Sequence, residues 1–161
     1  MCTSVTKFSA LSDVQIALMF NTENPSQYRE RALREAQILE NHRTSYQQIA
    51  KRLESLIIQA ETQAKASPSK RGTISIDNIQ LNSVLLRGDE GVVDGLSVCP
   101  FSKKSCGAGD PKEIKNTKTK TSVTVDDRII HMIEKHEFFG KTYFGIQVEP
   151  EDLITTLELK C

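Results

Sequence analysis

The amino-acid sequence predicts an α+β protein, on three observations. Residues 24–66 contain no glycine and no proline after Pro25, and their apolar side chains recur at steps of three and four, which is typical of one amphipathic helix. After Gly72 the apolar residues recur at steps of two, which is typical of strands. The last forty residues return to a helix, strand, helix pattern. We expect an N-terminal helical hairpin with one long amphipathic helix, followed by a small α+β domain with a few short antiparallel strands and two C-terminal helices.

The N-terminal hairpin is marked by two helix starts. Ser12 and Gln15 form a capping box, in which the hydroxyl and the amide each satisfy an N–H at the start of a helix. Asn24 and Pro25 provide a cap and a favourable first residue for the long helix. Residues 21–23 leave room only for a tight connection, so the first helix should fold back on the second. The predicted division of the chain is a flexible N-terminus at 1–11, a helical hairpin at 12–66, a linker at 67–72 and an α+β domain at 73–161 with a mobile basic loop at 103–121.

The stretch that follows the predicted linker is expected to form short strands. Residues 73–76 and 79–81 alternate between apolar and polar side chains, and residues 84–86 form a short apolar run. A short helix over 73–86 is the competing prediction, because its isoleucines and leucines also suit helical spacing. An Asp–Gly pair at 94–95 lies between β-prone residues, as in a tight hairpin turn.

The last third of the chain is expected to begin with a mobile loop and to end as helix, strand, helix. Residues 112–121 contain one apolar side chain in ten, which is typical of a linker. Residues 129–133 then line a helix that Gly140 can end. Residues 142–148 alternate as a strand with one dry side, and Pro150 opens a last helix with acids in its first turn.

One stripe of the long helix recurs at steps of three and four over about three heptads, and it is apolar at every position except His42. A stripe of this length can pack on a partner helix or on a second copy of the chain. The alternative is that it packs inside the chain, on residues 12–20 and the sheet. The predicted partner-binding residues are Leu39, Tyr46, Ile49, Leu53 and Leu56.

Composition argues against several function classes. Lys plus Arg equals Asp plus Glu at 21 each, which does not favour a protein built mainly around nucleic acid or an anionic membrane. No apolar run approaches the ~20 residues that cross a bilayer, and no secretory signal opens the sequence. Four cysteines lie far apart, unlike a disulfide framework. We expect an intracellular protein, cytoplasmic or nuclear, with no membrane partner.

Metal-ligand residue types occur in one set, formed by Cys99, Cys106, His131 and His136. Six residues separate the two cysteines, whereas zinc-binding cysteines are usually about two to four residues apart. The two histidines are five positions apart on a predicted helix, which directs them about 140° away from each other. We therefore expect free thiols, no metal and no other cofactor, with a disulfide or a zinc site as the alternatives.

No catalytic or phosphate-binding motif is present, so we expect the protein not to be an enzyme. The long helix instead predicts a non-enzymatic protein–protein interaction protein, an adaptor or a subunit of a larger complex, that uses residues 24–66. The alternative is a weak, sequence-tolerant nucleic-acid-binding module that uses the Lys-rich loop at 103–120. That loop contains no arginine, and the one aromatic residue beside it is Phe101, so base readout would be poor.

Overall fold

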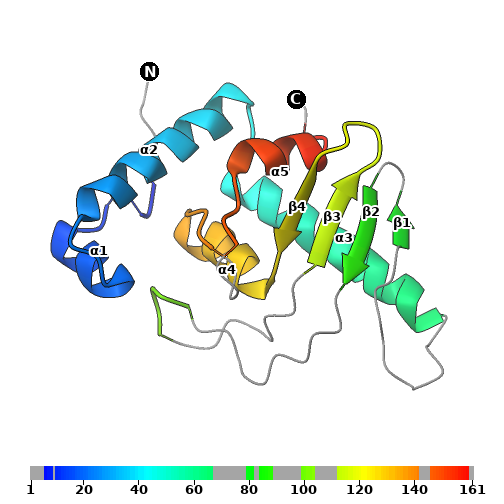
Figure 1. Cartoon of the computed structure of the whole chain (residues 1–161), viewed down its shortest axis with the longest axis horizontal. Helices are drawn as coiled ribbons and strands as arrows, with labels where there is room; N and C mark the ends of the chain where they lie inside the picture. Colours follow the sequence, from blue (N-terminus) through cyan, green and yellow to red (C-terminus); the bar gives the residue numbers. More distant parts are fainter. Residues whose placement is uncertain are drawn as a thin grey trace.

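The structure is a computed structural model that describes residues 6–8, 10–66, 79–81, 84–88, 99–103, 112–141 and 146–159. Within these residues it has five helices and one antiparallel sheet, so the predicted α+β class is confirmed (Figure 1). None of the described helices has the length and apolarity needed to span a bilayer. The elements are α1 (Asp13–Phe20), α2 (Pro25–Asn41), α3 (Tyr46–Ala66), β1 (Ile79–Leu81), β2 (Val84–Gly88), β3 (Lys112–Asn116), β4 (Ser122–Val125), α4 (Asp127–His136) and α5 (Pro150–Thr156).

The four strands form an antiparallel sheet in the order β1-β2-β3-β4. Leu86 pairs with Ile114, and Ile114 pairs with Val123, so one row of buried apolar side chains crosses the sheet. The strands expected at 79–81 and 84–86 are confirmed, and the competing helix is wrong for these residues. The linker expected at 67–72, the strand expected at 73–76 and the turn expected at 94–95 lie outside the described part of the chain.

The helices cover the sheet from more than one side. In Figure 1, α3 passes behind the strands, where it contacts β1 and α4. Helix α5 packs on β3 and β4 and also touches α2, while α1 packs on α2 as the predicted hairpin requires. The resulting core joins all parts of the described chain.

The prediction of one continuous helix over 24–66 is wrong, because the chain turns between α2 and α3. Arg43 adopts a left-handed conformation with φ of 53°, and the Thr44 N–H bonds back to the Leu39 carbonyl at 3.0 Å. Ser45 then starts α3, since its Oγ accepts a hydrogen bond from the Gln48 N–H at 3.2 Å. The spacing of Ser45 and Gln48 matches a capping box. This helix start is not evident from the sequence, because the apolar spacing of the stripe continues across it.

The prediction of a mobile loop at 103–121 is wrong for its second half, which forms β3 and a tight turn. Ile114 and Asn116 are the buried residues of this strand. The Asn116 side chain accepts hydrogen bonds from the N–H groups of Lys118 and Thr119 at 2.9 and 3.0 Å, and it donates to the Thr156 carbonyl at 3.0 Å. The polar composition of this segment predicted a loop, but a strand of five residues can be mostly polar, because only two of its side chains face inward here.

Helix α4 forms where it was expected, with different ends. Asp126 caps it by accepting a hydrogen bond from the Ile129 N–H at 2.9 Å. It stops at His136, because Glu137 is left-handed with φ of 52°, and not at Gly140. Most of the strand expected at 142–148 lies outside the described residues, and its described end shows one isolated bridge, between Lys141 and Gln147.

The N-terminal segment is anchored by an aromatic cluster, so the flexible segment expected at 1–11 is wrong for its described residues around Phe8. Phe8 is fully buried and stacks on Phe138, with ring centroids 4.4 Å apart. Phe20 and Phe101 contact the same two rings. This cluster joins the N-terminus, α1, the turn at 99–103 and the segment after α4.

Glu35 is a buried carboxyl group on the inner side of α2. Its Oε1 accepts a hydrogen bond from Arg31 Nε at 2.7 Å, and its Oε2 accepts one from the Phe139 N–H at 3.4 Å. Loss of hydration raises the pKa of Glu35 to about 7, and the two donors offset only part of this rise. An unfolded glutamate has a pKa of about 4.3. The folded protein therefore keeps a proton on Glu35 at pH values where the unfolded chain has released it.

We predict that Glu35→Gln removes a pH dependence from stability. The unfolding free energy of the wild type should fall by roughly 3 kcal/mol as pH rises through the two pKa values, since the unfolded chain holds fewer protons there. Urea unfolding of both proteins between about pH 4.5 and pH 8 measures the difference. Glu40→Gln, at an exposed position on the same helix, is the control. Parallel profiles for wild type and Glu35→Gln would contradict the prediction.

Candidate metal centre

Three side chains with metal-binding atoms converge beside the end of α4. The ligand atoms of Cys99, His131 and His136 all lie within 4.8 Å of one another. The expectation that the two histidines diverge and do not meet Cys99 is therefore wrong. The angle of about 140° is the angle around the helix axis between the two points where the side chains leave the backbone. His136 is the last residue of α4, so no following helical turn restricts its ring, and the ring can turn toward His131.

The turn that contains Cys99 is held against α4 by packing. The Lys103 N–H bonds to the Cys99 carbonyl at 2.8 Å, which closes a single turn. Phe101, within this turn, stacks on the His136 imidazole with ring centroids 4.2 Å apart and planes 9° apart. Cys99 and Pro100 are buried. The thiol of Cys99 therefore comes from a segment 32 positions before His131 in the sequence.

The two histidines present their nitrogens to the same space. Their ring centroids are 5.2 Å apart, in an edge-on arrangement. His136 Nε2 lies 3.4 Å from the Cys99 sulfur. His131 Nε2 is buried and has no hydrogen-bond partner in the described part of the chain. A buried polar atom without a partner is uncommon in proteins, and a bound ion is one of the ways in which such an atom is satisfied.

The spacing fits a tetrahedral zinc ion. Zinc bonds of about 2.3 Å to sulfur and about 2.0 Å to nitrogen place these ligand atoms about 3.5 Å apart. The 3.4 Å between Cys99 Sγ and His136 Nε2 already matches this value. The other pairs, within 4.8 Å, would need to approach by about 1.5 Å at most, which side-chain rotation can supply. One thiolate and two imidazoles form a ligand set that zinc commonly takes.

The environment of His136 favours the protonation state of a ligand. Burial lowers the pKa of His136, and the positive charges of His131 and Lys7 lower it further. A neutral imidazole has the free nitrogen lone pair that a metal requires. The same shift opposes an imidazolium paired with a thiolate, which is the state of an activated cysteine nucleophile. Cys99 has no exposed surface through which a substrate could reach its sulfur.

A cavity beside His131 could admit a cation. Its volume is about 310 Å³, and its lining includes His131, Glu54 and Glu134. The two carboxyl groups share a hydrogen bond, which raises the pKa of Glu54 and lowers that of Glu134. Carboxylates along an entry path raise the local concentration of cations.

The five residues predicted to bind a partner lie in the core of this chain. All are buried, and they pack in the same cluster as the sheet and α4. Tyr46 contacts the Phe139 ring, with centroids 5.5 Å apart. The burial of these residues agrees with the alternative prediction, that the stripe packs inside the chain. They are Leu39, Tyr46, Ile49, Leu53 and Leu56.

The lysines predicted to contact nucleic acid are divided between several places. Lys115, Lys118 and Lys120 are exposed on the β3–β4 hairpin, and Lys103 is exposed in the turn after Cys99. Lys112 is half-buried at the start of β3. Lys104 and Cys106 lie outside the described residues. The lysines therefore form no single patch within the described part of the chain.

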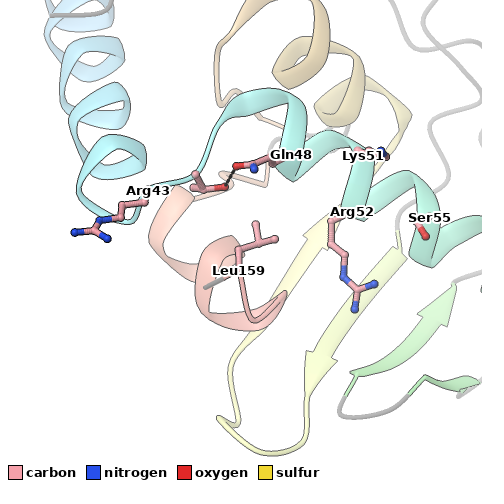
Figure 2. A pocket seen from close by; sticks show the side chains of 7 residues that line it. Arg43, Gln48, Lys51, Arg52, Ser55 and Leu159 are labelled. Atoms are coloured by element: carbon pink, nitrogen blue, oxygen red, sulfur yellow. Dashed lines mark hydrogen bonds between the residues drawn. The ribbon is translucent and has the colours of Figure 1, made fainter. Parts of the chain in front are cut away.

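A basic pocket lies where α2 passes into α3. Its volume is about 410 Å³, and none of its described lining residues is an acid. Figure 2 shows Arg52 extending over the strands, whereas Arg43 points away from the residues of α3, so the cations do not converge on one point. The arrangement suits a broad basic face better than a site for one phosphate. The lining residues are Arg43, Thr44, Gln48, Lys51, Arg52, Ser55 and Leu159.

Comparison with known proteins does not assign the chain to a family. No family model matches the chain, and neither a curated protein nor a solved structure matches it. Its function must therefore be inferred from the geometry of the chain itself.

Proposed function

We propose that this protein binds one zinc ion through Cys99, His131 and His136. The observation that supports this proposal is the convergence of the three ligand atoms within 4.8 Å, with His131 Nε2 buried and unpaired in the described part of the chain. Three protein ligands leave the fourth zinc position to water or to a further ligand. We propose a structural role for the metal, because the fully buried Cys99 offers no exposed surface to a substrate. The ion would join the turn at 99–103 to the end of α4, and a reduced thiol ligand is consistent with a cytosolic or nuclear location.

We predict that the purified chain takes up one Co²⁺ or Zn²⁺. Cobalt bound to thiolate and imidazole in a tetrahedral site should give visible absorption bands, and zinc should displace it. With zinc at about 100 times its dissociation constant, the melting temperature should rise by about 5–10 °C. Absorption spectroscopy, elemental analysis and thermal unfolding measure these effects.

The metal-binding variants have a matched control. Cys99→Ser, His131→Ala and His136→Ala should each lose the cobalt bands and the zinc-dependent rise in melting temperature. His42→Ala should keep both, because His42 is exposed at the end of α2. A wild-type protein that shows no cobalt spectrum would contradict the proposal, as would cobalt bands that survive the loss of Cys99.

We also propose that the folded domain acts as an adaptor or complex subunit through α1 and not through the buried stripe. Val14 and Leu18 are 68% and 76% exposed, and they lie one helical turn apart. Ile16, between them, is buried, so the two exposed side chains lie on the opposite face from the one that α1 packs inward. An apolar pair on a solvent face suits a partner helix.

We predict that the α1 face mediates self-association of this chain. Light scattering should give a dimer mass for the wild type, with a monomer mass for the double variant Val14→Asp, Leu18→Asp. Leu33→Asp, at a half-exposed position on α2, is the control and should leave the mass unchanged. A wild-type monomer at every concentration would rule out the second copy as the partner.

The alternative function, weak nucleic-acid binding, is supported by the exposed lysines of the β3–β4 hairpin. We predict that single-stranded DNA binds with little sequence preference and that binding falls steeply with salt. Replacing Lys115, Lys118 and Lys120 with Gln should reduce the salt slope by about 0.7 for each phosphate that the hairpin no longer neutralises. Fluorescence anisotropy at several salt concentrations tests this prediction, and an unchanged slope would exclude the hairpin as the binding surface.

A further inference from the structure

A third cavity lies between α1, α2, α4 and the segment that follows α4. Its volume is about 290 Å³, at the small end of the ~300–1,000 Å³ range of small-molecule sites. Its wall comes from the end of α1, the first turns of α2, the first half of α4 and the chain after α4. The lining residues are Phe20, Gln27, Tyr28, Arg31, Arg128, Met132, Phe138, Gly140, Lys141 and Gln147.

Arg31 forms a fixed part of this wall. Besides its bond to Glu35, its guanidinium donates to the Gln147 side-chain oxygen at 2.6 Å and to the Phe139 carbonyl at 3.0 Å. Gln147 in turn donates to the carbonyls of Gly140 and Val148, at 3.1 Å each. These bonds hold the chain after α4 against α2, so the cavity is preformed.

Arg128 and Lys141 bring charge to the cavity that no described acid neutralises. The Arg128 Nε is buried and has no hydrogen-bond partner in the described part of the chain. Among the described residues, no ion pair uses either side chain and no acid lines the cavity. A buried guanidinium nitrogen without an acceptor is costly, and an anionic ligand would supply the acceptor.

The opposite side of the cavity is apolar and aromatic. Phe20 stacks on Tyr28, with ring centroids 4.6 Å apart and planes 18° apart, and Phe138 lies 5.5 Å from Phe20. Gly140 lies close to Met132 in this wall, since a side-chain Cβ there would come within 2.5 Å of the Met132 methyl group. A flat apolar group can contact these rings.

We propose that this cavity binds a small organic carboxylate with an apolar, preferably aromatic, body. The carboxylate would accept hydrogen bonds from Arg128 and pair with Lys141, and the body would lie against Phe20, Tyr28 and Phe138. A guanidinium fork matches the two oxygens of a carboxylate. The aromatic wall disfavours inorganic phosphate, which has no apolar part, and the small volume of the cavity excludes a macromolecule. The site shares no ligand residue with the metal centre, so it does not depend on metal binding.

The test is a titration of the full chain with phenylacetate, followed by heteronuclear NMR and calorimetry. Acetate supplies the charged group alone, benzyl alcohol the aromatic body alone, and inorganic phosphate a different anion. We expect saturable binding of phenylacetate at least about tenfold tighter than that of each of the other three, with shifts at the amides of Met132 and Gly140.

Charge-removing variants test the two cations separately. Arg128→Gln and Lys141→Gln should each weaken phenylacetate binding about tenfold or more, and Arg52→Gln, on the basic face of α3, should leave it unchanged. Lys141 is exposed, so its variant should fold even if Arg128→Gln does not. Absence of saturable phenylacetate binding would overturn the proposal. Equal binding of phosphate, equal binding of benzyl alcohol, or full affinity in Lys141→Gln would do the same.

Discussion

The left-handed turn at Glu137 is the constraint on which the N-terminal half of the fold depends. Because α4 ends there, the next two residues, Phe138 and Phe139, contact different parts of the N-terminal half. Phe138 joins the aromatic cluster of Phe8, and the Phe139 N–H meets the buried carboxyl group of Glu35. A non-glycine residue in this conformation carries a local cost of about 1 kcal/mol, which the packing on either side must offset. The N-terminal segment, α1 and α2 all pack on what this turn presents.

The two candidate sites both draw polar residues from α4 and use them in different ways. In the candidate metal centre, the imidazoles of His131 and His136 lie beside the buried thiol of Cys99. Toward the N-terminal end, Arg128 faces a cavity with no acid among its described lining residues. The core residues of α4, such as Ile129 and Ile133, are fully buried between them. One helix thus supplies the rigid support that both sites need, because α4 packs along α3.

Local spacing predicted most helices and two strands, because those features depend on residues close in sequence. The capping box at Ser12, the proline start of α2 and the alternation in β1 all belong to this group. The break at Arg43 was missed because apolar spacing continues across it. The strand β3 was missed because a five-residue strand can be mostly polar. The meeting of Cys99 with His131 depends on how a distant turn packs on α4, and no local pattern encodes that packing.

The meeting of Cys99 with His131 would have a topological consequence for the unfolded chain once a metal ion holds the two residues together. A metal ion held by Cys99 and His131 would close a loop of about 33 residues that contains β3 and β4. By the chain-entropy argument used for disulfides, such a closure removes conformational freedom from the unfolded state worth about 3–4 kcal/mol. The ion would therefore act as a reversible crosslink, and the strands inside the loop would search a smaller space before they pair. In this protein the stacking of Phe101 on His136 brings the loop ends together without a covalent bond.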